Sequence, residues 1–270
     1  MPVRRGAALV TRSVLSVRAL PVAALLLTLS GCAGGTGFGR QYEYDEQIYL
    51  SADGSATVAI SASIPALVAL HGLPLDTAPR ARIDRDSVRE MVEEPGLEIS
   101  RVSRIWRRDG RQFIQIRAEI DDVRNLGKTK LFQWAAVTLA DMPDGSREYR
   151  QRIGTPAGML PAGAGYGWNG SELVAFKLHL PSRINTHNVR DIDTNETGTV
   201  ERGNILTWEQ RLSDRLEGKP IDMRVGMERG SILYRTLSLF AASFAAAILL
   251  LAIIIWRIVR RGRARNQARA

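Results

Sequence analysis

The chain has 270 residues, with 37 lysines and arginines against 28 aspartates and glutamates, and a formal net charge of +9. Eleven of the arginines lie in residues 1–32 and 231–270, which contain no acid, so the 26 basic residues and 28 acids between them leave a net charge of −2. This balance argues against nucleic acid as a partner, and the single cysteine excludes an internal disulfide and any metal site built from a cysteine pair.

Residues 1–31 have the layout of a signal peptide, with an arginine-bearing start followed by the apolar run 19–29. At about 1.5 Å per residue, this run is too short to cross roughly 30 Å of hydrocarbon. The letters LSGC at 29–32 resemble the bacterial lipobox, which implies that Cys32 is acylated and that the peptide before it is removed. The alternatives are an uncleaved membrane anchor and an ordinary thiol.

Residues 32–40 are rich in glycine and predict a flexible leash. Residues 41–230 form the predicted extracytoplasmic domain, which is long enough to bury a core. Alternation of apolar and polar residues dominates this domain and predicts strands. Hairpins are expected at 42–64 around Asp53 and Gly54, at 97–120 around Asp109 and Gly110, and at 131–153, with further strands at 172–180, 205–212 and 221–227.

Helices are expected only as short pieces, at 65–72, 84–94 and 121–127. The first begins with Pro65 and ends at Gly72, and the second is amphipathic. Hairpins with a few short helices indicate an α+β domain with an antiparallel, curved sheet, followed by one C-terminal transmembrane helix.

The segment 64–75, IPALVALHGLPL, has almost no polar face. A helix that is apolar all round is buried or touches lipid. One interpretation is a core helix that closes an end of the sheet. The other is a segment that lines a cavity or a membrane-facing lip. In that case the candidate lipid-contacting residues are Leu67, Val68, Leu70 and Leu73.

Two stretches match a known binding motif only in part, one a dinucleotide-binding motif and the other a calcium-binding loop. Gly165, Gly167 and Gly170 fit G-x-G-x-x-G, yet they lie in the long loop 155–170 and a strand follows them, whereas a dinucleotide site needs a helix there. That loop is expected to be either functional or disordered. The letters DIDTN at 191–195 begin a calcium-loop pattern that later positions break, which leaves an irregular cation site or a solvated acidic loop.

The three histidines, His71, His179 and His187, do not have the spacing of a zinc protease, and no nucleophile elbow is present. We therefore expect no catalytic residue, no metal and no cofactor, and a protein that is not an enzyme.

Residues 236–256 contain no charge over 21 residues, which predicts a transmembrane helix with Trp256 at the interface. The arginine-rich tail, 257–270, places the C-terminus in the cytoplasm. The predicted location is the bacterial cytoplasmic membrane, with the domain outside the cytoplasm, held by the span and by a lipid on Cys32.

The lipobox, the strand-rich domain and the terminal span together resemble the LppM-like lipoproteins. The resemblance is carried by FKLHLPSRINTHNV at 176–189 and GTVERGNILTWEQRL at 198–212. The residues that match the family pattern are Pro181, Gly203, Asn204 and Trp208. It implies an extracytoplasmic domain that engages membrane glycolipids. The phosphoinositide mannoside of the mycobacterial members is not carried over.

We therefore expect a non-enzymatic lipoprotein whose domain binds a lipid or glycolipid at the membrane surface. Its partners would be membrane lipids or glycolipids and not nucleic acid. The alternative is a protein-interaction scaffold or accessory subunit, with a protein partner in an envelope complex.

Overall fold

The computed structural model describes residues 40–158 and 166–267. Residues from Gln41 onwards form one unit. The expected signal peptide, Cys32 and nearly all of the expected leash lie outside the described residues, so acylation of Cys32 stays a prediction.

The first sheet has seven strands. Its order is β10 (Ile205–Arg211), β8 (Leu173–His179), β1 (Tyr42–Leu50), β2 (Ala56–Ser63), β5 (Arg111–Ile120) and β3 (Glu98–Val102), with β4 (Trp106–Arg108) also paired to β5. β1 and β8 are parallel, and the other neighbours are antiparallel. A parallel pair needs a long connection. Here the chain between β1 and β8 forms β2, β3, β4 and β5 of the same sheet, and then the first hairpin of the second sheet.

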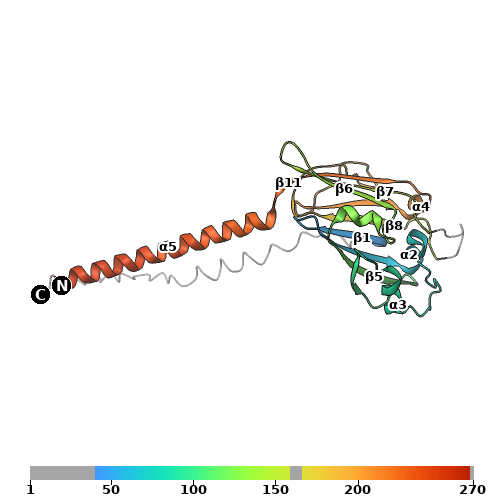
Figure 1. Ribbon diagram of the computed structural model, residues 1–270, viewed down its shortest axis with the longest axis horizontal. Coiled ribbons are helices and arrows are strands. Elements are labelled where there is room, and N and C mark those ends of the chain that lie inside the picture. The colour runs from blue at the N-terminus through green and yellow to red at the C-terminus, as the bar shows by residue number, and fades with distance from the viewer. Residues whose placement is uncertain (1–39, 159–165, 268–270) are drawn as a thin grey trace, which may run out of the picture. The chain divides into compact units, whose positions relative to one another are not determined.

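The second sheet has four antiparallel strands, in the order β6 (Ala135–Asp141), β7 (Arg147–Ile153), β11 (Ile221–Ser231) and β9 (Ser182–His187). Figure 1 shows the two sheets as two layers. Side chains that point inward from both sheets form one core, for example Tyr44 and Phe176 from the first sheet and Tyr149 and Val225 from the second.

The helices are α2 (Ile64–His71), α3 (Arg85–Val92), the 3-10 helix η1 (Val123–Lys128), α4 (Leu212–Leu216) and α5 (Ile232–Gln267). α2 begins where the Ser63 side chain accepts the N–H of Ala66, and it ends at Gly72, which has φ +68°. A side-chain cap at the start and a left-handed glycine at the end are what delimit so short a helix.

The α+β class is confirmed, and the three expected hairpins are present. Four details differ from the expectation. The strands form two sheets rather than one, and the β1–β8 pair is parallel. β9 was not predicted, because its only apolar residue is Ile184. Leu212, expected at the end of a strand, begins the helix α4.

α5 contains one stretch, Thr236–Arg257, that is long and apolar enough to cross a membrane. None of this 22-residue stretch is buried against the rest of the protein. The helix continues to Gln267, beyond the predicted end of the span at residue 256. The expected apolar C-terminal helix is therefore present.

Candidate functional site

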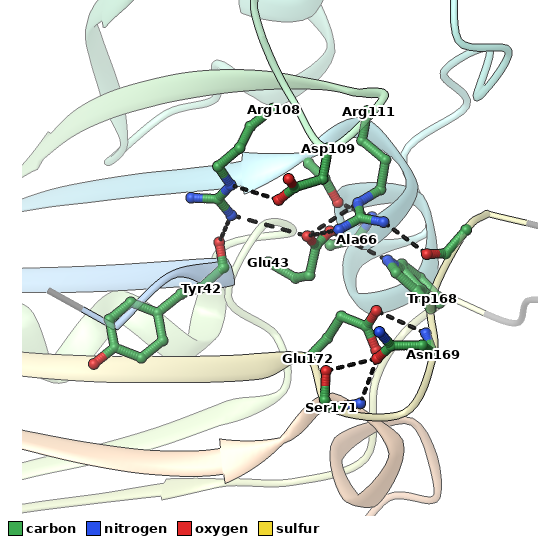
Figure 2. Close-up of polar contacts among 12 residues, drawn as sticks. Tyr42, Glu43, Ala66, Arg108, Asp109, Arg111, Trp168, Asn169, Ser171 and Glu172 are labelled. Carbon is green, nitrogen blue, oxygen red and sulfur yellow. Dashed lines mark hydrogen bonds and ion pairs between the residues drawn. The ribbon is translucent and has the colours of Figure 1, made fainter. Parts of the chain in front are cut away.

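A polar cluster lies where β2 ends. β2 separates β1 from β5 as far as Ser63, which pairs with Phe113, and the chain then turns away into α2. Beyond that point nothing separates the flanking strands, so Glu43 of β1 meets Arg111 of β5 directly (Figure 2). The contact joins residues 68 positions apart in the chain.

The turn between β4 and β5 delivers two arginines to this point. Asp109 and Gly110 have φ values of +49° and +75°, which is the geometry of a tight two-residue hairpin turn. Arg108 and Arg111 flank the turn and face each other as a cross-strand pair. Two like charges in that position repel each other, and the carboxylates of Glu43 and Asp109 offset this repulsion.

The Glu43 side chain is only 3 % exposed, and three residues lie around its carboxylate. Arg111 donates from Nε and Nη2 to Oε1, at 3.0 and 2.8 Å. Trp168 donates from its indole N–H to Oε2 at 3.2 Å, and Arg108 Nη2 lies 3.9 Å from Oε1. A buried carboxylate is tolerated only when it is paired in this way, so its position is set in advance of any ligand.

The loop after residue 165 closes the cluster. Arg111 Nη1 donates to the carbonyl oxygen of Gly167 at 2.8 Å. Glu172 accepts the backbone N–H groups of Asn169 and Gly170, at 2.8 and 2.9 Å. Asn169 in turn accepts from the backbone and hydroxyl of Ser171. The first bond joins the loop to β5, and the others hold the segment from Asn169 to Glu172 together (Figure 2).

These residues surround a polar pocket of about 380 Å³. It is lined by Gln41, Glu43, Arg108, Asp109, Arg111, Gly167, Asn169, Ser171 and Glu172. Two guanidinium groups and three carboxylates leave a local charge of −1. The pocket therefore offers both donors and acceptors without an excess of positive charge, which suits neutral hydroxyl groups better than phosphate, because each hydroxyl both donates and accepts.

The predicted lipid-contacting residues lie elsewhere. Leu67 and Leu70 belong to the core, each with an exposed fraction of 0 %, while Val68 and Leu73 are half-buried. None of the four lines the polar pocket. Contact between this segment and a lipid stays a prediction, and it would have to involve the two half-buried side chains unless the core opens.

A second set of titratable groups is buried between the sheets. His71 Nδ1 lies 2.7 Å from the carbonyl oxygen of Leu131, and its Nε2 lies 3.0 Å from the hydroxyl of Tyr44. Tyr44 bonds Glu46 at 2.6 Å, and Gln151 donates to the other oxygen of Glu46 at 3.4 Å. Burial raises the pKa of Glu46 to about 7 and lowers the pKa of His71 to about 4.

In the acidic loop at 191–195, one oxygen of Asp191 accepts hydrogen bonds from within the same turn. Asp191 Oδ1 accepts the N–H groups of Asp193 and Thr194, at 3.0 and 2.9 Å. Among residues 40–158 and 166–267, no group of three or more His, Cys, Asp or Glu side chains could hold a metal ion.

The polar cluster was not predicted from the sequence. The sequence predicts Asp109 as a turn residue and the loop 155–170 as either functional or disordered, but it gives no reason to single out Glu43 or Arg111. One signal was available: β1 reads YEYDEQIYL, and three acids in one strand are unusual because acidic residues are depleted in strands.

Comparison with known proteins adds a distant structural similarity. No family model and no curated protein matches the chain. Among solved structures, the chain is similar to the folded domain of LppM from Mycobacterium tuberculosis, determined by NMR, at 12 % sequence identity and a TM-score of 0.35. The match covers 72 % of this chain and 95 % of that domain.

Proposed function

We propose that the domain binds the sugar part of an envelope glycolipid in the polar pocket beside Glu43, and that it does so without catalysing a reaction. The observation that carries this proposal is the pocket itself. A buried carboxylate, two guanidinium groups and a bonded loop are fixed in place around about 380 Å³ of space, with donors and acceptors in balance. Fixed polar groups bind a polar ligand well because little ordering cost remains.

The charge of the pocket favours a neutral saccharide over an anionic headgroup. Arg111 already donates to Glu43 and to Gly167, and Arg108 is shared between Tyr42, Glu43 and Asp109. A phosphate would have to displace these partners and would meet three carboxylates. Sugar hydroxyls can instead add to the arrangement as it stands.

The membrane location rests on α5 and on the sequence flanking it. Thr236–Arg257 is long enough to span, and the arginines after it belong on the cytoplasmic side. The domain then lies outside the cytoplasm of a bacterial cell. A lipid on Cys32 would hold its other end at the same membrane.

The pocket and the start of α5 lie at opposite ends of β1. Ile232, the first residue of α5, donates its N–H to Pro181, and it borders the same crevice as Ser51, which follows β1. Glu43 is eight residues from Ser51, or about 26 Å along a strand.

The test uses the full chain in nanodiscs of phosphatidylcholine, because glycoside detergents would compete. Methyl glycosides of common hexoses and short oligosaccharides are titrated by calorimetry. Gln41→Ala and Asn169→Ala, which each remove one lining group, are expected to weaken binding about 2- to 12-fold, as the loss of one hydrogen bond does. Asn185→Ala, which changes an exposed residue outside the pocket, serves as the control.

Two results would refute the proposal. One is a chain that binds no saccharide, and the other is binding that Asn185→Ala weakens as much as Asn169→Ala. A stoichiometric protein that co-purifies with the chain, together with the first result, would support the envelope scaffold instead.

A further inference from the structure

We infer that the bound saccharide carries an apolar substituent, and that this substituent occupies a second pocket separated from the polar one by the bond between Arg111 and Gly167. The inference rests on the proposed function and specifies the class of its ligand: a sugar with an alkyl or acyl group close to the hydroxyls that the polar pocket holds.

The two pockets are neighbours that share one wall. The second has a volume of about 220 Å³, and it shares Asp109, Arg111 and Gly167 with the polar pocket. The shared wall contains the bond from Arg111 Nη1 to the Gly167 oxygen. One ligand can therefore enter both pockets by passing over this bond.

The lining of the second pocket is mainly apolar where the first is polar. Ile64, Pro65, Pro79 and Tyr166 supply its apolar walls. Ile64 begins the apolar segment 64–75, so part of that segment does line a pocket, although not through the four residues predicted for lipid contact. A hydrocarbon group placed here would leave water for an apolar surface, which favours binding.

The walls of this pocket are held in place by polar and ring contacts. Gln112 is buried, and its side chain donates to the carbonyl oxygens of Pro79 and Ala81, at 2.9 and 3.0 Å. Pro65 lies in the capped first turn of α2. Tyr166 packs against Trp168, with ring centroids 5.3 Å apart, and Trp168 is bonded to Glu43. The apolar walls are therefore tied to the groups that form the polar pocket.

The size of the second pocket limits its occupant. A volume of about 220 Å³ lies below the range of pockets that take a whole drug-sized ligand, roughly 300–1,000 Å³. It suits a short substituent and not a complete membrane lipid chain.

The experiment varies the apolar group on one sugar. The full chain in phosphatidylcholine nanodiscs is titrated with the methyl, butyl and hexyl glycosides of the hexose that binds most tightly, and empty nanodiscs measure partition into the bilayer. Each methylene that enters an apolar pocket is expected to tighten binding up to about fourfold until the pocket is full. Tyr166→Ala should weaken the hexyl glycoside more than the methyl glycoside and so reduce this gain, whereas Met91→Ala, at an exposed site on α3, should change neither.

The outcomes separate this inference from the proposed function. If methyl glycosides bind and longer chains bind no more tightly, the inference is wrong and the proposed function stands. Equal weakening of the methyl and hexyl glycosides by Tyr166→Ala would also overturn it. If no glycoside binds at all, the proposed function fails and takes the inference with it.

Discussion

His71, Tyr44 and Glu46 form a buried hydrogen-bonded series. Substituting His71 or Glu46 is expected to make the stability of this domain depend strongly on pH, with opposite signs for the two substitutions. His71 Nε2 and the Glu46 carboxyl group both lie within hydrogen-bond distance of the Tyr44 hydroxyl, which has a single hydrogen to donate. Because the Leu131 carbonyl only accepts, Nδ1 of His71 must carry a proton, and Nε2 of the neutral ring must accept from Tyr44. A protonated Glu46 can then donate to Tyr44, which satisfies all three groups.

The magnitude follows from the two pKa values. Burial raises the pKa of Glu46 from 4.5 to about 7, which is worth about 3 kcal/mol and makes stability fall as pH rises from about 4.5 to 7. Burial lowers the pKa of His71 from 6.5 to about 4, so its contribution makes stability rise by about 3 kcal/mol between pH 4 and 6.5. Between about pH 4.5 and 6.5 the two effects cancel. In the folded protein Glu46 holds a proton and His71 does not, whereas in the unfolded protein His71 holds one and Glu46 does not. Both states therefore bind the same number of protons, and unfolding does not depend on pH through this pair.

Single substitutions remove this cancellation. In Glu46→Gln only His71 titrates, so the free energy of unfolding should rise by about 3 kcal/mol from pH 4 to 6.5. In His71→Gln only Glu46 titrates, so the free energy of unfolding should fall by about 3 kcal/mol from pH 4.5 to 7. The nearby charged groups, Asp45 and Arg215, are the same in both variants.

The assay is urea unfolding of the full chain in nanodiscs, followed by tryptophan fluorescence at several pH values, with each variant compared to the parent protein. Trp134 is a suitable reporter because its ring lies 4.7 Å from that of His71. Two results would refute the proton assignment. One is a free energy of unfolding that changes with pH in the same direction in both variants. The other is a difference in this free energy between variant and parent that changes by less than about 0.5 kcal/mol over this pH range.

Three further predictions concern the site, the fold and the anchor. Arg111→Ala leaves the buried Glu43 carboxylate with weaker partners and should cost about 3–5 kcal/mol in urea unfolding, against less than 1 for the exposed Arg152→Ala; equal costs would contradict the pairing argument. Gly127→Ala places a Cβ 1.8 Å from the Ala135 carbonyl oxygen and should lower the thermal midpoint, at a cost of about 1–3 kcal/mol; an unchanged midpoint would show that the backbone yields there. Replacing the arginines of 257–270 by glutamates should move a reporter fused to the C-terminus out of the cytoplasm in part of the molecules, and an unchanged location would argue against orientation by the tail.

The candidate site could be predicted only in pieces. Asp109 and Gly110 were expected to form a tight turn, and they do, so the positions of Arg108 and Arg111 beside that turn were implicit. Glu43 could not be linked to them, because nothing local in the sequence relates a residue to one 68 positions away. The loop from Gly167 to Glu172 acquires its role only when Arg111 bonds to it.

By itself the sequence determined the local features of this protein: which faces of the strands are buried, where α2 begins and ends, and which C-terminal stretch is apolar enough to span a membrane. These depend on contacts within a few residues, such as the cap from Ser63 to Ala66. Only the tertiary structure decided that β1 and β8 run parallel, that β9 completes a second sheet, and that Glu43 meets Arg111. The reason is that alternation specifies which face a side chain takes, whereas the partner and direction of a strand depend on pairing across the whole fold.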